Sequence, residues 1–318
     1  MGQRKGKQKK RKRLPPSPFR DAPVPRPKAS KGERQKRFVL EELLGTGGMC
    51  EVYSALDLWR LEWSDASPRV ALKRLLPELA DIQQAQIALA QEFFTLRHLV
   101  HPGVVRVYDL HPDPSGVCFS MELLDSGSLH KTQASHPSGL GMEGIWIAEK
   151  LFATLHFLHR KGVVHADIKP ANLFPEPDKR LVLIDFNISQ VTAKPGAAGS
   201  PIAQGLRSKL KFSAHSLLHC SPERLRSGRP SMADDIFSAS CTVYELVTGR
   251  HPFNRLSSVE AEEKNLIPLK PGGFTGRQWK LLLHGLSFSA AERPGAEELW
   301  RAFSPSVKFP WLGMSLTG

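Results

Sequence analysis

The stretch from residue 165 to residue 185 constrains the fold of this chain more than any other feature. It places Asp167, Lys169 and Asn172 after one hydrophobic run that is rich in β-branched residues, and Asp185 directly after a second such run. Two carboxylates, an ammonium and an amide at such short, fixed spacings are the groups that phosphoryl transfer requires. A chance origin is credible for either half of the pattern alone, but not for both halves in this order and at this separation.

The positive charge of the chain is confined to its start. The formal net charge is +13, and residues 1–37 alone hold fifteen Lys or Arg against two acidic residues, so the rest of the chain balances to zero. Six prolines between Pro15 and Pro27 keep such a segment extended. We therefore expect residues 1–37 to form a disordered basic, Pro-rich arm. The remainder is not expected to be a basic nucleic-acid-reading fold.

Cysteine spacing and hydropathy predict the cellular setting. Cys50, Cys118, Cys220 and Cys241 form no C-x-x-C pair and no zinc spacing, which favours unpaired thiols in a reducing compartment. No apolar segment follows the basic start, so we expect no secretory signal. No run of about 18 apolar residues is present, so we expect no transmembrane segment. The sequence predicts a soluble, cytoplasmic protein.

The part of the chain after the arm divides into a strand-rich half and a helix-rich half. Alternating apolar residues predict five strands, at 38–44, 52–58, 70–75, 104–110 and 117–121. One amphipathic helix, at 83–98, interrupts them, with Ile87, Phe94 and Leu96 on or near its apolar side. Helical periodicity then predicts helices at 143–161, 233–248, 276–286 and 296–303. Residues 304–318 are predicted to be an irregular tail.

The segment from His165 to Asn172, together with Asp185-Phe186-Asn187, resembles the catalytic loop and metal-binding triplet of the protein kinase family. The resemblance implies an α+β, bilobal kinase fold, with a five-stranded antiparallel sheet and one helix in the N-lobe and a larger, mainly helical C-lobe. The order of predicted elements leads to the same arrangement without the motifs. The expected boundaries are 1–37 for the arm, 38–303 for the kinase domain (N-lobe 38–121, hinge 122–127, C-lobe 128–303) and 304–318 for the tail.

The resemblance also implies a role for each polar group of the catalytic loop. Asp167 is the expected base, Lys169 the cation that stabilises the moving phosphoryl group, and Asn172 and Asp185 the ligands of Mg²⁺, or of Mn²⁺ in its place. The lysine in D-x-K-P-x-N is typical of Ser/Thr-directed members of the family. The implied function is an ATP- and Mg²⁺-dependent protein serine/threonine kinase, with autophosphorylation as a further expectation.

A second group of residues is implied to bind the nucleotide. Residues 44–53 resemble the glycine-rich loop of bacterial Ser/Thr protein kinases, although a plain β-turn explains such a loop about as well when it stands alone. Alternation places Ala71 and Lys73 on one face of a strand. Glu92 is the expected ion-pair partner of Lys73, and Gln91 competes for that role. The implied nucleotide contacts are Gly45, Thr46, Gly47, Gly48, Val52, Ala71, Lys73, Glu92, Glu122, Leu124, Asp125, Asn172 and Leu173.

Three positions depart from the family pattern. Cys50 stands in place of the third glycine of the loop, Ala166 in place of the arginine of H-R-D, and Asn187 in place of the glycine of D-F-G. Without that arginine, the usual cationic partner of a phosphorylated activation loop is missing. Two functions are therefore weighed: an active kinase, and a pseudokinase that acts as a nucleotide-binding interaction module.

Further residues predict the partners. Glu223, in Ser-Pro-Glu, and Arg293 resemble the ion pair that anchors the substrate platform of the family, and Asp235 resembles the aspartate that braces the catalytic loop. Because that platform seats a polypeptide, the implied partners are protein substrates. For the arm we expect weak electrostatic contact with an anionic membrane or nucleic acid, and a plain solubilising tail is an equally open alternative.

Overall fold

The computed structural model describes residues 37–63, 67–113, 116–186, 190–191, 214–227 and 230–304. Contacts divide the chain into Met1–Arg37 and Phe38–Gly318, and the description below concerns the second unit. The predicted arm up to residue 36, the Asn187 substitution and the tail after residue 304 lie outside the described residues.

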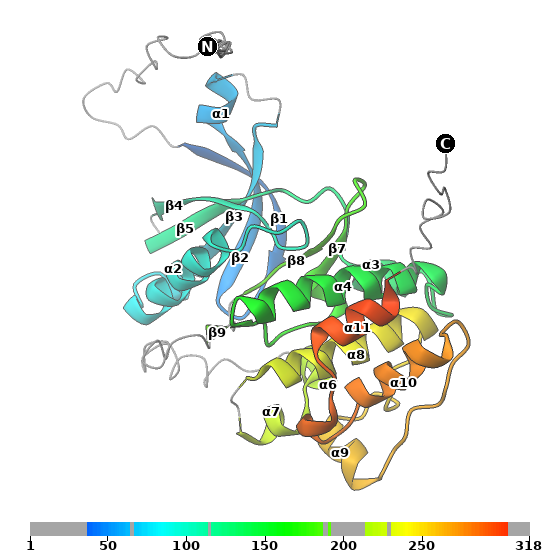
Figure 1. Ribbon diagram of the computed structural model, residues 1–318. Helices are drawn as coiled ribbons and strands as arrows, with labels where there is room; N and C mark the ends of the chain where they lie inside the picture. The colour runs from blue at the N-terminus through cyan, green and yellow to red at the C-terminus, as the bar shows by residue number, and fades with distance from the viewer. Residues whose placement is uncertain are drawn as a thin grey trace, which may run out of the picture. The chain divides into compact units, whose positions relative to one another are not determined.

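The first half of this unit is a five-stranded antiparallel sheet with one long helix against it (Figure 1). The strand order is β1-β2-β3-β5-β4. The strands are β1 (Phe38–Thr46), β2 (Cys50–Asp57), β3 (Arg69–Leu75), β4 (Val107–Asp113) and β5 (Gly116–Met121). Helix α2 (Gln83–Arg97) contacts β3, β4 and β5, and a 3-10 turn, η1 (Pro77–Leu79), precedes it. The predicted five-stranded antiparallel sheet and the helix predicted at 83–98 are confirmed.

Helix α2 differs from the prediction in the face that it buries. Its buried side chains are Ala85, Ala88, Leu89, Glu92, Phe93 and Leu96, which recur at the three- and four-residue spacing of one helix face. Phe94 was predicted to lie on or near this face, but it is 50% exposed. It is offset from Phe93 by one residue, which is about 100° around a helix, and only Phe93 meets the sheet through Phe119.

Two element boundaries also differ from the prediction. Strand β4 begins three residues later than expected, because Val104 instead forms a parallel bridge with Leu183 of the second half. Strand β2 ends at Asp57, whose carboxylate accepts a hydrogen bond from the Trp59 N–H at 3.1 Å. This cap starts a short helix, α1 (Leu58–Glu62), where the sequence predicted only the end of a strand.

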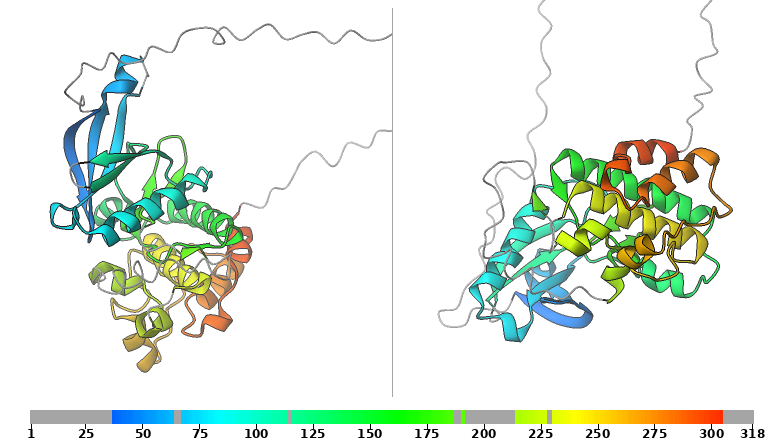
Figure 2. Two further views of the ribbon diagram at one scale, coloured as in Figure 1. Left: turned by 90° about the vertical axis from the view of Figure 1, so that its left-hand side faces the viewer. Right: turned by 90° about the horizontal axis from the view of Figure 1, so that it is seen from below.

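The second half is mainly helical and is confirmed as such. Its long central helices are α4 (Met142–Arg160) and α8 (Met232–Thr248), which contact each other. Helix α8 begins with a capping box between Ser231 and Asp234 and ends at Gly249, which has a φ of 70°. The other helices are α3 (Leu129–Ala134), α6 (Ala214–His219), α7 (Pro222–Ser227), α9 (Ser258–Glu263), α10 (Gly276–Gly285) and α11 (Ala296–Phe303). Helix α11 packs along α4 (Figure 2).

Short strands and 3-10 turns complete the second half. Strands β7 (Leu173–Pro175) and β8 (Leu181–Leu183) form one hairpin, and β6 (Val163–Val164) pairs with β9 (Gln190–Val191). The 3-10 turn η2 (Pro170–Asn172) precedes β7, and η3 (Ala290–Glu292) precedes α11. One hydrophobic cluster runs through both halves. None of the helices described combines the length and apolar character needed to span a bilayer.

Candidate functional site

The site is organised around Lys73, which the alternation of β3 points inward. Its ammonium donates to Glu92 Oε1 of α2 at 2.7 Å and to Asp185 Oδ1 at 3.1 Å. The Lys73 side chain is only 6% exposed, whereas that of Asp185 is 32% exposed. Glu92 Oε1 also accepts the Phe186 N–H at 3.1 Å. Of the two candidates for the ion pair, Glu92 rather than Gln91 contacts the lysine.

Electrostatics holds Lys73 and Asp185 in their charged forms. Burial alone would lower the pKa of the Lys73 ammonium, but the carboxylates of Asp185 and Glu92 outweigh it and raise that pKa above its ordinary value. Burial likewise acts to raise the pKa of Asp185, but the charge and hydrogen bond of Lys73 hold it below its usual range. A cation fixed beside an ionised carboxylate is suited to contact phosphate on one side and a divalent metal on the other.

The catalytic loop brings three of the predicted residues together. Lys169 Nζ donates to Asp167 Oδ2 at 2.7 Å. The side-chain amide of Asn172 donates to the backbone carbonyl of Asp167 at 2.8 Å and to Asp167 Oδ2 at 3.1 Å. Ile184, next to Asp185, donates its N–H to the Asn172 carbonyl at 3.0 Å. Asp167, Lys169 and Asn172 thus form one hydrogen-bonded network, and the backbone bond from Ile184 joins it to the segment that carries Asp185.

Asp235 of α8 braces the backbone of this loop. Its two carboxylate oxygens accept the N–H groups of His165 and Ala166 at 2.9 and 2.7 Å. Ala166 has a φ of 69°, in a region that costs a non-glycine residue on the order of 1 kcal/mol or more. The two hydrogen bonds hold this conformation, so the substitution of Ala166 for the family arginine leaves the loop backbone in place.

The side chains of His165 and Phe186 pack against each other. Their rings meet edge to face, with centroids 4.6 Å apart. His165 Nδ1 accepts the Asp167 N–H at 3.2 Å, so the ring proton is on Nε2, which donates to the Ile184 carbonyl at 3.1 Å. The imidazole therefore supports the backbone on both sides of the site.

The glycine-rich loop is the tip of the β1–β2 hairpin. The Gly47 N–H donates to the Cys50 carbonyl at 2.8 Å, while Gly45, Thr46 and Gly48 are exposed at the tip. A Cβ placed on Gly45 would meet no atom within 4 Å, so packing within the chain does not require glycine there. Glycine at this position would be required for a ligand to approach the backbone closely.

Cys50, which replaces the third glycine, points away from solvent. It is 3% exposed, and burial raises the pKa of its thiol to about 12. The residue is therefore a small hydrophobic group at the base of the loop and remains a neutral thiol at physiological pH.

Apolar residues from both halves form a wall where an adenine ring would be expected. Ala71 and Leu173 belong to the continuous buried cluster, and Val52 and Leu124 are partly buried against it. Val52 is the strand partner of Lys73, and Ala71 is paired with Met121 at the start of the hinge. The structure thus brings the predicted base-contacting residues to the same side of the sheet as the lysine.

The donor set fits a divalent metal. Asn172 uses both amide hydrogens as donors to Asp167, which leaves its side-chain oxygen as the coordinating atom. Asp185 keeps part of its carboxylate exposed. Carboxylate and amide oxygens are the ligands that Mg²⁺ prefers, so Asn172 and Asp185 are the residues that would hold it.

The hinge is fixed by two carboxylates that the sequence analysis did not identify as such. Glu176, after β7, is buried and accepts the N–H groups of Asp125 and Ser126 at 3.2 and 3.3 Å. The Glu122 side chain accepts from Arg180 at 3.1 Å and from a backbone N–H before β4 at 2.8 Å. No sequence motif marks these long-range pairs.

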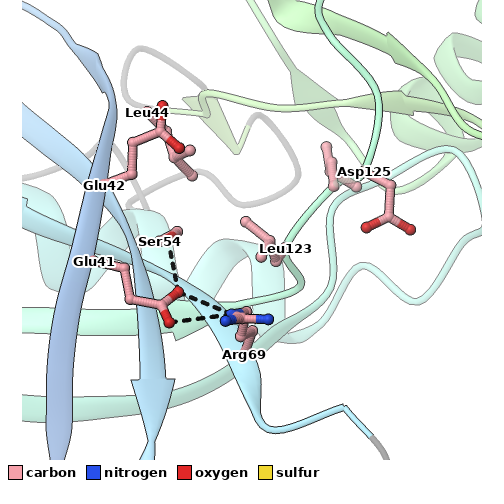
Figure 3. Close-up of a pocket in the computed structure, with 8 residues that line it drawn as sticks. Glu41, Glu42, Leu44, Ser54, Arg69, Leu123 and Asp125 are labelled. Carbon is pink, nitrogen blue, oxygen red and sulfur yellow. Dashed lines mark hydrogen bonds and ion pairs between the residues drawn. The ribbon is translucent and has the colours of Figure 1, made fainter.

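A cavity of about 410 Å³ opens beside the hinge. Glu41 accepts from Ser54 at 3.1 Å and from Arg69 at 3.0 Å on the sheet side, with Leu123 and Asp125 on the hinge side (Figure 3). Its lining residues are Glu41, Glu42, Leu44, Ser54, Arg69, Leu123, Leu124 and Asp125. Arg69 and Ala71 point to the same face of β3. The cavity therefore lies on the face of the sheet where the nucleotide is expected, on the far side of Ala71 from Lys73.

The predicted platform contacts are also present. Arg293 Nη2 donates to Glu223 Oε2 at 2.9 Å, and a second guanidinium nitrogen of Arg293 contacts the other carboxylate oxygen. Such a two-point pair fixes the orientation of α7 against the turn before α11. Helix α6 is held nearby, because His219 Nε2 lies 3.0 Å from Glu245 Oε2 of α8.

Comparisons with known proteins agree with this site. The family model for the protein kinase domain matches residues 38–282. The serine/threonine-protein kinase PkaA of Streptomyces coelicolor is 28% identical over 275 residues, which are 83% of this chain and 49% of that protein. The serine/threonine-protein kinase PknB of Mycobacterium tuberculosis is 30% identical over 227 residues, which are 70% of this chain and 34% of that protein. The fold and the matches define a phosphotransferase class, and the chain belongs to the protein kinase family.

The relatives are longer than the chain. It spans about half of the length of PkaA and about a third of the length of PknB. The similarity therefore concerns the kinase domain, and members of this family use ATP and a divalent metal to phosphorylate proteins.

Proposed function

We propose that the chain is an active protein serine/threonine kinase that transfers the γ-phosphoryl group of ATP to Ser or Thr hydroxyls of protein substrates. The observation that carries this proposal is the Lys73 ammonium held between Glu92 and Asp185. This arrangement positions both the phosphate-binding cation and the metal-binding carboxylate before any ligand arrives. Pre-positioned charge is the main source of catalysis in phosphoryl transfer.

The residues of the chain have distinct tasks in the proposed reaction. When bound, ATP would supply the phosphoryl group, and Mg²⁺ would neutralise part of its negative charge. Asp167 orients the substrate hydroxyl and accepts its proton at a carboxylate oxygen, and Lys169, 2.7 Å from that carboxylate, stabilises charge on the transferred group. Lys73 orients the α- and β-phosphates, while the hydrophobic wall excludes water from the base.

The lysine in the catalytic loop supports Ser/Thr as the acceptor, and the Glu223–Arg293 pair supports a polypeptide substrate, because it fixes the platform after the activation segment. None of the four cysteines, all of which lie in the described part of the chain, forms a disulfide, which supports a cytoplasmic location as part of the proposal. The kinase domain is proposed to extend from residue 38 to residue 303, with the hinge at 122–127. The segment at 193–213, where autophosphorylation is proposed, lies outside the described residues.

An assay with labelled ATP, Mg²⁺ and a mixture of Ser/Thr peptides tests the proposal. Replacing Asp167→Asn should lower kcat on the order of 10²–10⁴-fold, the usual contribution of a general base. Asp81→Asn, the same change at an exposed position, is the matched control and should retain full activity. Nucleotide binding without phosphoryl transfer by the unaltered chain would instead identify a pseudokinase.

A further inference from the structure

Large apolar side chains are exposed around the short helix α1. This helix buries none of its residues. Five exposed apolar residues, here called the α1 patch, lie on α1, just after it, or on the neighbouring strand β1. They are Val39 (48% exposed), Leu40 (39%), Trp59 (39%), Leu61 (49%) and Trp63 (55%).

Strand register places the α1 patch around one end of the sheet. Val39 is paired with Leu56 and Leu40 with Ala55, so both lie beside the last residues of β2, from which α1 directly follows. As consecutive strand residues they point to opposite faces of the sheet, so the exposed apolar side chains surround this end. The rings of Trp59 and Trp63 are neighbours, with centroids 6.5 Å apart. Figure 1 and the left view of Figure 2 place α1 at the end of the sheet that is remote from the helical half.

The most basic part of the chain is joined directly to this end of the sheet. Phe38, the first residue of β1, is paired with Asp57, the residue that caps α1. The 37 residues before Phe38 carry a net charge of +13. A strongly cationic segment and an exposed apolar patch are therefore covalently adjacent.

We propose that the α1 patch docks on an anionic lipid bilayer, with the basic arm supplying the electrostatic attraction. Tryptophan side chains favour the interface between headgroups and acyl chains, and clustered Lys and Arg are attracted to anionic lipid headgroups. Stable membrane binding by a protein without a spanning helix generally needs two such signals. A nucleic acid would use the positive charge alone and offers no counterpart for the α1 patch, so a bilayer fits both features better.

Co-sedimentation with vesicles of phosphatidylcholine and phosphatidylserine tests the docking at physiological salt, with the full chain and no nucleotide. The Trp59→Ala/Trp63→Ala variant should bind the vesicles more weakly by on the order of tenfold or more, because two large apolar side chains no longer enter the interface. The matched control is Ile267→Ala/Leu269→Ala, which removes two apolar side chains that are 76% and 80% exposed in the helical half. This control should bind as tightly as the wild type.

A spectroscopic readout separates docking from simple charge attraction. Vesicles with brominated acyl chains should quench the tryptophan fluorescence of the wild type, and the quenching should be lost in the Trp59→Ala/Trp63→Ala variant at protein concentrations where it is still bound. Equal melting temperatures in the absence of vesicles would show that both variants are folded. Equal vesicle binding by the patch variant and the wild type, or binding to duplex DNA with none to vesicles, would overturn the proposal.

Discussion

At the scale of single residues, the strongest constraint is the shared use of Lys73 by two carboxylates. The ammonium contacts groups that are 19 and 112 residues away along the chain. The 19-residue separation was predictable, because a strand lysine followed by the glutamate of the next helix is a pattern of the family. The contact with Asp185 was not predicted, since the sequence placed each residue in its own motif and did not show how the motifs meet.

Removing the charge of either Lys73 or Asp185 should abolish most phosphoryl transfer. We expect Lys73→Met and Asp185→Asn each to lower kcat on the order of 10²–10³-fold or more, the scale of losing one electrostatic stabiliser. Steady-state assays with saturating ATP and peptide measure this. Lys131→Met, at an exposed position of α3, serves as the control for the loss of a lysine. Near-full activity in either site variant would show that the charged network is structural only.

At the scale of elements, the hinge is held by the β7–β8 hairpin. Glu176 precedes the tight turn of this hairpin and accepts two hinge N–H groups, while Arg180, after the turn, contacts Glu122. One short hairpin of the helical half therefore fixes the segment that we propose binds the adenine edge. Hairpins of this size are stable only when packed against other elements, and this one is packed against α3 and α4.

Weakening the hydrogen bonds between Glu176 and the hinge should affect the binding of ATP more than the rate of phosphoryl transfer. A Glu176→Gln side chain keeps one acceptor oxygen but presents an amide group to the second hinge N–H. Hydrogen bonds to charged groups contribute about 1.5–3 kcal/mol, so we expect KM for ATP to rise by roughly tenfold or more with a much smaller change in kcat. Glu263→Gln, on the exposed end of α9, is the control. A large fall in kcat at unchanged KM would show that the hinge does not act through ATP binding.

Element types were easier to predict than element ends. Alternation and helical periodicity identified the sheet, α2 and the long helices, because these patterns depend on which face is buried. The start of β4 was wrong by three residues, since Val104 is a good strand residue that happens to pair with Leu183 across the two halves. Helix α1 was missed, because it has no buried face and only the Asp57 cap signals it. Long-range pairing and local caps decide these ends, and neither follows from periodicity.

At the scale of the whole molecule, the excess positive charge and the candidate catalytic residues lie in different parts of the chain. Residues 1–37 carry the whole excess of thirteen positive charges, whereas the contacts of the candidate site that are described above come from residues after Phe38. The family model also begins at residue 38. The proposed catalytic function therefore needs only the second part of the chain, and the proposed membrane docking needs both parts.

Deleting residues 1–37 should accordingly leave phosphorylation of a soluble peptide nearly unchanged, because no predicted site residue and no apolar surface of the sheet is removed. The same deletion should weaken binding to anionic vesicles, and the difference between intact and truncated protein should shrink as salt rises, since exposed charges are screened beyond about 8–10 Å near physiological ionic strength. Parallel peptide assays and salt-titrated sedimentation measure both effects. A fall in peptide activity at an unchanged melting temperature would place the arm in the catalytic cycle. Identical vesicle binding at low salt would reduce the arm to a solubilising tail.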